Sequence, residues 1–375
     1  MEPLPPHIEQ ILDAARTAPS HDNIQPWLFF VDGETISFAV DPERDRSPGG
    51  QTARIGVGAA LENALLCASR MGASVRHHEP RPGALVTITV SDPKRENEPD
   101  KARLRRATNR RLYDGRAVDD ATFLWLREAT PPLDLTRTHW FGRERVRALA
   151  PLMEEGETLY FAEPHLREET LRAIRFDVRD REEVTQGLSI GSLELSTTER
   201  MTLSGLRKAL EPRMVMAESR KMGARVRRLV ESASGLCVIT ARGSDPMTDA
   251  VVGRAMQRAW LALTRRGLVA QPLTAMMSLA AMAARPSDSA LLDIGRDTLP
   301  DTEGGQAAGG PVELLEAERR SKVEELLPTF RAAFPNLEHD ARIALLMRFG
   351  WAQPASARVR RRPLEESVIV AGGEG

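Results

Sequence analysis

The sequence repeats one pattern of helix, loop and strand, and this repeat constrains the fold more than any other feature. Residues 7–29 read HIEQILDAARTAPSHDNIQPWLF, and residues 121–141 read ATFLWLREATPPLDLTRTHWF. In both, apolar residues at helical spacing are followed by a polar loop with proline and then by a strand that contains tryptophan. The repeat predicts a chain built from two related halves.

Both halves also contain a central helix and further strands. Residues 56–71 and 249–267 are rich in Ala and Leu, which favours helices buried on most sides. Strands are predicted at residues 27–31 and 35–40, which form a hairpin, and at 84–90 and 235–240. The predicted fold class is therefore α+β, with two mostly antiparallel sheets flanked by helices.

The polar stretch 91–100 predicts a boundary between the halves. We expect the first half to span residues 1–98 and the second half to span residues 99–375. An insertion at about 160–234, with many Arg and Glu and few β-branched residues, predicts two or three amphipathic helices.

Composition excludes several classes of function. The 375 residues carry a formal net charge of -1, which gives no bulk attraction to nucleic acid or to anionic lipid. Cys67 and Cys237 lie in apolar runs and are expected to be buried thiols. His77 and His78 lie in a charged stretch that we interpret as a turn, without a metal-ligand set nearby, and no glycine-rich nucleotide motif is present. Without a signal peptide pattern or a long apolar run, the expected location is the cytoplasm.

The loop Ala18-Pro19-Ser20-His21-Asp22-Asn23-Ile24-Gln25-Pro26-Trp27 carries a hydroxyl and two amides at offsets of zero, three and five. Such groups can hydrogen-bond the carbonyls and ring nitrogens of a planar heterocycle without ionising. The same residues also suit a turn that ends a helix, with the tryptophan in the core. The spacing alone does not decide between these interpretations.

Two arginine-rich segments are candidates for binding an anion. Arg106 and Arg110 would lie one turn apart in a helix, from where both reach one phosphate. Near the C-terminus, residues 360–362 are three consecutive arginines that repel one another unless an anion or solvent screens them. A solvated basic face, a nucleic-acid patch or a frayed basic tail are the alternatives.

Together these segments resemble parts of the nitroreductase superfamily. The loop A-P-S-x-x-N-x-Q-P-W is similar to the family's flavin-contacting loop, and residues 105–110 are similar to its Arg-Arg-Ser-x-Arg segment, which holds the FMN phosphate and the pyrimidine edge of the ring. The C-terminal Arg-Arg-Pro-Leu-Glu resembles the family's end, where basic residues close on the phosphate. The resemblance implies a cofactor site made of Pro19, Ser20, Asn23, Gln25, Arg106, Thr108, Arg110, Arg111, Gln271, Pro272, Leu273, Thr274, Arg360 and Arg361, with Arg362 as an alternative to its two neighbours.

The resemblance also implies one FMN site rather than two. The usual site is shared by two subunits, whereas here the Ser20 loop belongs to the first half and the arginines to the second. The mirror-image site lacks an arginine cluster before Ile8 and lacks amides at residues 132–135. This asymmetry resembles the Acg-like branch, in which one chain imitates a homodimer. We therefore expect two fused nitroreductase-like halves in a monomer with internal pseudo-dimer symmetry.

If FMN binds, the chemistry belongs to the cofactor, and no side chain is assigned a catalytic role. The expected function is hydride transfer from NAD(P)H through FMN to a small nitroaromatic, quinone or similar acceptor. The helical insertion is expected to cover the pocket as a lid. Because a covered flavin would react poorly with nicotinamide, the alternative is a protein that binds or sequesters flavin with little reductase activity. Neither nucleic acid nor membrane is an expected partner.

Overall fold

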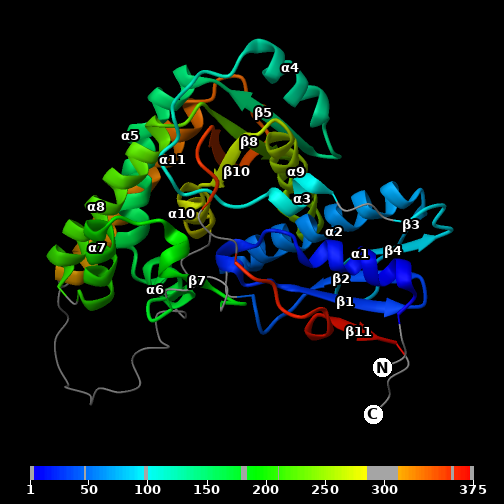
Figure 1. Ribbon diagram of the computed structural model, residues 1–375. Helices are drawn as coiled ribbons and strands as arrows, with labels where there is room; N and C mark the ends of the chain where they lie inside the picture. The colour runs from blue at the N-terminus through cyan, green and yellow to red at the C-terminus, as the bar shows by residue number, and fades with distance from the viewer. Residues whose placement is uncertain are drawn as a thin grey trace, which may run out of the picture.

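The computed structural model describes residues 4–45, 48–96, 100–178, 184–209, 211–284, 311–355 and 359–371. Within these ranges the chain forms a five-stranded sheet, a four-stranded sheet and a two-stranded pair, with helices around them (Figure 1). No helix of these ranges is both long enough and apolar enough to cross a membrane. The predicted α+β class is confirmed.

The elements have the following bounds. The α-helices are α1 (Pro6–Arg16), α2 (Gln51–Met71), α3 (Lys101–Arg105), α4 (Asp120–Ala129), α5 (Arg143–Ala162), α6 (Pro164–Ala173), α7 (Thr197–Lys208), α8 (Pro212–Glu231), α9 (Pro246–Arg265), α10 (Ala275–Ala283) and α11 (Pro311–Ala332). The strands are β1 (Trp27–Asp32), β2 (Thr35–Val40), β3 (Ser74–His78), β4 (Ala84–Ser91), β5 (Thr136–Phe141), β6 (Ile174–Arg175), β7 (Leu188–Ser189), β8 (Gly235–Ala241), β9 (Val269–Pro272), β10 (Arg342–Gly350) and β11 (Val368–Val370). Short 3-10 helices are η1 (His21–Asn23), η2 (Pro48–Gly50), η3 (Ile190–Leu193) and η5 (Leu364–Glu366).

The five-stranded sheet has the strand order β11-β1-β2-β4-β3. β1 and β2 form the predicted hairpin, with Trp27 opposite Val40 and Asp32 opposite Thr35. All pairs in this sheet are antiparallel except β1 with β11, which is parallel. β11 belongs to the predicted second half, so the end of the chain returns to lie beside β1 (Figure 1). The predicted boundary after residue 98 lies outside the described residues.

The four-stranded sheet has the order β5-β8-β10-β9 and is antiparallel throughout. Its strand β8 is buried along its whole length. Cys237 and Ile239 pack into the core that contains residues of α9, whereas Leu236 and Val238 pack into the core that contains residues of α5 and α8. Because both faces of the sheet are covered, β8 is an almost unbroken apolar run in the sequence.

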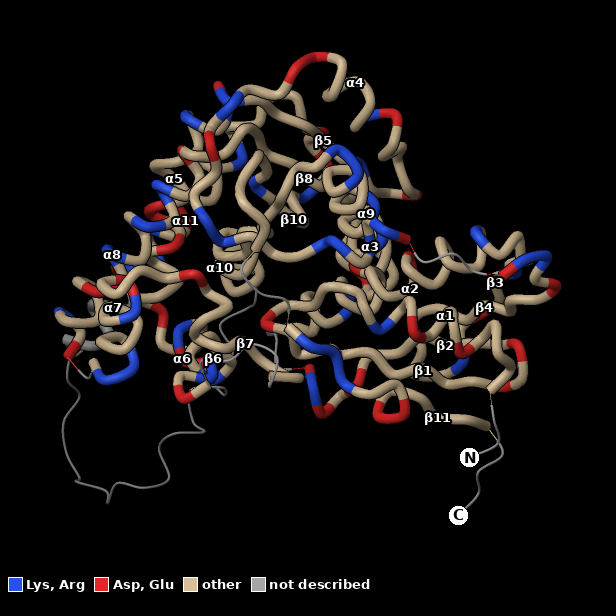
Figure 2. The backbone as a smooth tube through the Cα atoms, viewed as in Figure 1, with Lys and Arg blue, Asp and Glu red and all other residues tan. Residues whose placement is uncertain are grey.

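The predicted insertion at about 160–234 is largely helical, as expected. It contains α6, α7 and α8, and the short strands β6 and β7 pair in parallel. α8 packs along α5, and α7 packs on α8. Basic and acidic residues alternate over these helices (Figure 2), and ion pairs such as those of Arg227 with Glu154 and Glu231 link them. The helices therefore present a surface of mixed charge.

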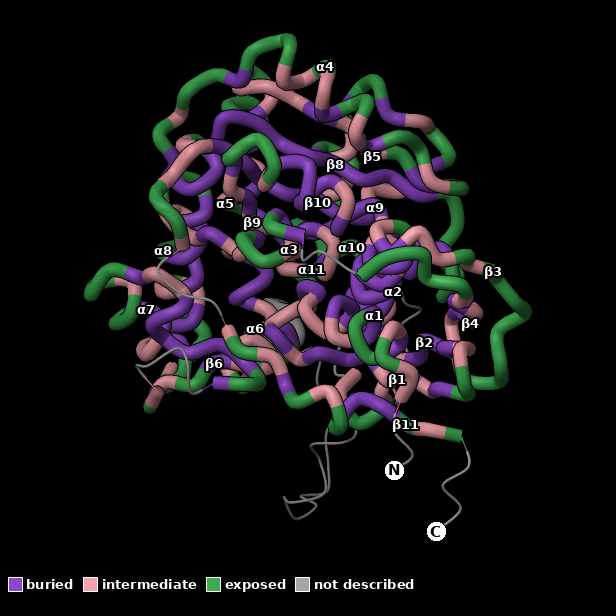
Figure 3. The backbone as a smooth tube through the Cα atoms, turned by 45° about the vertical axis from the view of Figure 1, so that its right-hand side comes forward, coloured by how far each residue is buried: buried purple, intermediate pink, exposed green. Residues whose placement is uncertain are grey.

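The two Ala- and Leu-rich helices, α2 and α9, pack against each other at glycine positions in the largely buried centre of the molecule (Figure 3). A Cβ added at Gly58 would lie 1.9 Å from the carbonyl oxygen of Ala250, and one at Gly253 would lie 2.0 Å from that of Ile55. Because only glycine lacks a Cβ, only glycine permits backbones to approach this closely.

A polar cluster lies in the same helix interface. Glu62 of α2 is fully buried and forms salt bridges with Arg254 at 3.1 Å and Arg258 at 2.5 Å, both on α9. Gln257 Nε2 donates to Asn63 Oδ1 at 2.7 Å. Buried polar groups without partners are costly, so these pairs fix the register in which α2 and α9 meet.

Two local predictions are wrong. His77 and His78 lie in β3, which pairs with β4, rather than in a turn. Arg106 and Arg110 do not lie one helical turn apart, because α3 ends at Arg105 and the backbone of Arg106 has φ -55° and ψ 124°. The following Thr108 forms a β-bridge with Ala270, which holds the segment extended.

Candidate functional site

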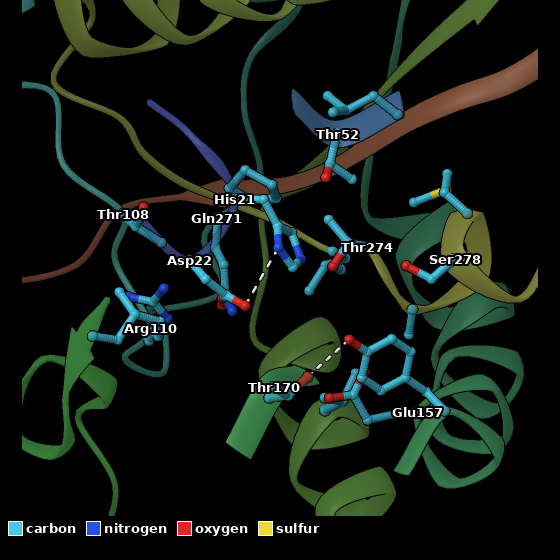
Figure 4. Close-up of a pocket in the computed structure, with 18 of the residues that line it drawn as sticks. His21, Asp22, Thr52, Thr108, Arg110, Glu157, Thr170, Gln271, Thr274 and Ser278 are labelled. Carbon is cyan, nitrogen blue, oxygen red and sulfur yellow. Dashed lines mark hydrogen bonds and ion pairs between the residues drawn. The ribbon is translucent and has the colours of Figure 1, made fainter. Parts of the chain in front are cut away.

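A cavity of about 260 Å³ lies between the two sheet-containing parts of the chain. Its wall combines segments far apart in sequence: the loop after α1, the start of α2, the extended stretch after α3, helices α5 and α8, and the junction of β9 with α10. Figure 4 shows how their side chains surround the space. Among the described residues, no group of three or more His, Cys, Asp or Glu side chains could hold a metal ion.

The Ser20 loop forms one edge of the cavity. Pro19 and Ser20 line it, and the Ser20 hydroxyl oxygen accepts a hydrogen bond from the backbone N–H of Gln25 at 3.0 Å. Gly56 of α2 packs behind this loop, since a Cβ at that position would lie 3.2 Å from Pro26 and 3.5 Å from Ser20. The small residue in the helix thus lets the loop lie close to α2.

Asn23 and Gln25 are buried but do not line the cavity. Asn23 Nδ2 donates to the carbonyl of Thr185 at 3.4 Å, and its Oδ1 accepts from Arg361 Nη1 at 2.7 Å. Gln25 Nε2 donates to the same Thr185 carbonyl at 2.5 Å, and its Oε1 accepts from the backbone N–H of Arg362 at 2.8 Å. These two amides therefore tie the Ser20 loop to the insertion and to the C-terminal tail.

Arg106 and Arg111 also point away from the cavity. Arg106 donates through Nη2 to the carbonyl of Thr17 at 3.1 Å, and its guanidinium carbon lies 4.8 Å from the ring centroid of Trp260. Arg111 forms a salt bridge with Glu194 at 2.9 Å. Both guanidinium groups support the cavity wall from behind rather than facing the interior.

Thr108 and Arg110 do line the cavity. Arg110 Nη1 donates to the carbonyl of Ser192 at 3.3 Å, and in the described part of the chain no carboxylate forms a salt bridge with its guanidinium. Burial lowers the pKa of Arg110, and the charge of Asp22 opposes this effect. Arg110 is therefore a desolvated cation at the cavity, with no salt bridge to any carboxylate that the structure describes.

In the C-terminal tail, neither Arg360 nor Arg361 lines the cavity. Arg360 is exposed, and its carbonyl accepts from Asn23 Nδ2 at 3.3 Å. Arg361 Nη2 donates to the carbonyl of Ala18 at 2.9 Å, in addition to its bond to Asn23. Burial, with a smaller contribution from the charge of Arg16, lowers the pKa of Arg361 to about 10. This guanidinium links the start of the Ser20 loop, at Ala18, to its middle, at Asn23.

Residues 271–274, at the junction of β9 and α10, all line the cavity. Gln271 Oε1 accepts from Arg348 Nε at 2.8 Å. Arg348 is fully buried in β10, donates to the carbonyl of Leu229 at 3.0 Å, and lies 3.9 Å from the ring centroid of Tyr113. The side chain of Gln271 is therefore held in one orientation by a residue that itself has no freedom to move.

Several cavity residues were not predicted from the sequence, among them His21, Asp22, Glu157 and Arg225. His21 and Asp22 belong to the predicted loop but were passed over, and they form an ion pair at 3.3 Å. Arg225 follows Met222 at helical spacing, and both line the cavity. That spacing was the available signal. No sequence signal distinguished Glu157, because α5 contains several other glutamates.

Comparisons with known proteins give distant similarities. No protein-family model matches the chain. The chain is 25% identical to the uncharacterized protein MT1398 of Mycobacterium tuberculosis (strain CDC 1551 / Oshkosh), and the match covers 72% of this chain and 39% of that protein. The chain thus spans about two fifths of the length of this curated relative.

The similar solved structures include a nitroreductase-like family protein from Bacillus cereus, with 13% identity, a TM-score of 0.34, and coverage of 72% of this chain and 95% of that one. A nitroreductase with bound FMN from Bacteroides fragilis has 11% identity, a TM-score of 0.31, and coverage of 73% and 96%. The FMN-dependent nitroreductase NfnB from Mycobacterium smegmatis, in complex with NADPH, has 14% identity, a TM-score of 0.34, and coverage of 70% and 92%. These identities and TM-scores are too low to assign the activity or the cofactor of those proteins to this chain.

Proposed function

We propose that the chain binds one FMN in this cavity and transfers hydride from NAD(P)H to a small nitroaromatic, quinone or similar acceptor. We further propose that it is a fused, pseudo-dimeric member of the nitroreductase superfamily, of the Acg-like branch. The proposal extends the sequence resemblance, which was recognised from three separate segments.

The observation that carries the proposal is the convergence on one cavity of two of those segments and of one further stretch, whereas the C-terminal segment does not line it. Pro19 and Ser20 come from the first, Thr108 and Arg110 from the second, and residues 271–274 from a stretch that was selected only by the resemblance. Residues 111–270, a stretch of 160 residues, separate the second segment from this stretch. A set of unrelated surface turns would not be expected to meet around a single space.

The side chains present suit a flavin. Arg110 supplies a desolvated positive charge for a phosphate. Ser20, Thr108 and Gln271 supply neutral hydrogen-bonding groups for ring carbonyls and nitrogens, while Ile55 and Met256 add apolar surface for the faces of a ring. When bound, FMN would accept a hydride from a nicotinamide and return it to an acceptor. The protein's own contribution is to bind, to orient and to exclude water.

The test is the absorbance spectrum of the purified protein, with released flavin quantified per chain. We expect one FMN per chain at saturation. Arg110→Glu should abolish binding, because it places a carboxylate where the phosphate requires a cation. Asp134→Asn, in the corresponding loop of the second half, should leave binding unchanged. A colourless protein that takes up no FMN, or equal effects of the two substitutions, would contradict the proposal.

Anaerobic mixing of the FMN-loaded protein with NADPH then tests the activity. Loss of the oxidised flavin absorbance would support the reductase. Tight FMN binding without reduction would support the alternative, a flavin-sequestering protein, because residues of the insertion, such as Leu188, Leu203 and Met222, form part of the cavity wall.

A further inference from the structure

Glu157 of α5 is a cavity residue to which the proposed function gives no chemical role. It lines the cavity one helical turn before Tyr160 and Phe161, which line it too. In the described part of the chain, no hydrogen bond or salt bridge holds its carboxyl group, whereas the neighbouring Tyr160 hydroxyl is paired with Thr170 Oγ1 at 2.8 Å. A carboxyl group without a protein partner, facing an interior space, is available to a ligand.

The surroundings of Glu157 disfavour its ionised form. Burial raises the pKa of the carboxyl to about 7, and the opposing effect of the Arg225 charge is smaller. Arg225 cannot fully neutralise a carboxylate here, because it lies 3.3 Å from Glu199 and also donates to the carbonyl of Leu193. The neutral, protonated carboxyl is therefore well populated near neutral pH.

The other elements around this part of α5 bring few charges. η1 contributes His21 and Asp22, which pair with each other, and α6 contributes His165 and Glu169, which lie 3.8 Å apart. α10 has no charged residue, and α11 packs on α5 through buried apolar side chains. Arg167 of α6 donates to the carbonyls of Phe161 and Ala162. From α8 come Arg225, which pairs with Glu199 of α7, and Arg227, which pairs with Glu154.

Glu157 also lies on the opposite side of the cavity from the cation. In Figure 4, Arg110 and Thr108 are on one side, and Glu157 and Ser278 are on the other. A ligand whose phosphate meets Arg110 would leave the Glu157 side open for a second molecule. Apolar residues such as Leu203, Met222 and Val226 also line the cavity and suit an uncharged, planar molecule.

We propose that Glu157 donates a proton to the carbonyl oxygen of a quinone-type acceptor bound on this side of the cavity. The inference rests on the proposed function, which supplies the reductant, a reduced flavin. The acceptor gains two electrons and one proton as a hydride, which gives the hydroquinone anion. The O–H bond of Glu157 then breaks, an O–H bond forms on the acceptor oxygen, and the neutral hydroquinone leaves. Water reprotonates the carboxylate.

The experiment measures reoxidation of the reduced, FMN-loaded protein by 1,4-benzoquinone and by ferricyanide across pH. Ferricyanide takes up electrons without protons, so it reports on access and electron transfer alone. We expect Glu157→Gln to slow the quinone reaction by about 100-fold, the range of general acid catalysis, and to remove its decline as pH rises through 7. The ferricyanide rate, FMN affinity and reduction by NADPH should not change.

Glu155→Gln is the matched control, because Glu155 is an exposed glutamate on the same helix and does not line the cavity. It should behave as the wild type. Glu157→Asp should restore part of the quinone rate and its pH dependence.

A second measurement does not depend on activity. Binding of 1,4-benzoquinone to the wild-type protein should weaken as pH rises through 7, because the carboxylate repels the carbonyl oxygen, whereas the glutamine variant should bind equally at all pH values. A Glu157→Gln variant with wild-type quinone rates, pH profile and binding would overturn this inference and leave the proposed function intact. A protein that takes up no FMN would overturn both.

Discussion

Gly58→Ala should destabilise the protein by about 2 kcal/mol, although alanine is normally the better helix former. The added methyl group would lie 1.9 Å from the carbonyl oxygen of Ala250 and 2.8 Å from its Cα. Because ordinary contact begins near 3.4 Å, α2 and α9 must separate by about 1.5 Å. Overpacking costs about 1–3 kcal/mol, and the upper end applies here because the obstructing atoms are backbone and cannot rotate away. The higher helix propensity of alanine offsets about 1 kcal/mol of this overpacking cost.

The matched control is Gly205→Ala. Gly205 lies inside α7, and its added Cβ would lie 3.4 Å from the flexible side chain of Glu218, which is ordinary contact. This variant should be more stable than the wild type by about 0.5–1 kcal/mol, since it gains helix propensity without a clash. Urea unfolding followed by tryptophan fluorescence compares the two. If Gly58→Ala were as stable as Gly205→Ala, the close approach of α2 and α9 at this position would be refuted.

Two further predictions concern titratable groups. Glu157 has an ordinary pKa of 4.5 when unfolded and about 7 when folded, so its contribution to stability is complete below pH 4.5 and is lost as pH rises through 7. The loss amounts to at most about 3 kcal/mol. Glu157→Gln should therefore flatten the pH dependence of the unfolding free energy in this window, and an unchanged slope would contradict the assignment. Burial raises the pKa of Cys67 to about 11 and also raises that of Cys237, so neither thiol of the native protein should react with a thiol reagent at mildly alkaline pH, whereas both should react in urea.

The parts of the fold that could be predicted from the sequence are those whose apolar pattern lies in one short stretch of neighbouring residues. The hairpin of β1 and β2 was predicted from two β-rich runs on either side of Asp32-Gly33-Glu34, and its register agrees. The two buried thiols followed from the apolar runs around Cys67 and Cys237. In each case neighbouring residues carry the signal, and distant contacts only reinforce it.

The missed elements depend on distant partners. β11 has three residues, Val368–Val370, and exists because it pairs with Phe29 to Val31 at the other end of the chain. β3 contains Arg76, His77 and His78 and lacks an apolar alternation, since it is a largely exposed edge strand whose strand partner is β4. No local pattern encodes such pairings, so residues 368–370 were not predicted as a strand and His77 and His78 were interpreted as a turn.

The predictions for the candidate site show the same difference between local signals and distant contacts. Eight of the fourteen residues that the resemblance implies line the cavity: Pro19, Ser20, Thr108, Arg110, Gln271, Pro272, Leu273 and Thr274. A sequence motif does not indicate which of its polar side chains faces the cavity and which forms hydrogen bonds with other loops. Asn23, Gln25 and Arg361 bond to one another and to residues more than 150 positions away, and such contacts leave no trace in local spacing. Their assignment to the cofactor stays a prediction.

The cavity and the helix interface are also parts of one physical unit. Ile55 and Gly56 of α2 and Met256 and Trp260 of α9 line the cavity, within a few residues of the glycines at which the helices meet. The cavity therefore keeps its shape only while α2 and α9 remain in close contact. A ligand that binds only this arrangement stabilises it by about 2.7 kcal/mol at a concentration one hundred times its dissociation constant. That energy is similar in size to the cost expected for Gly58→Ala.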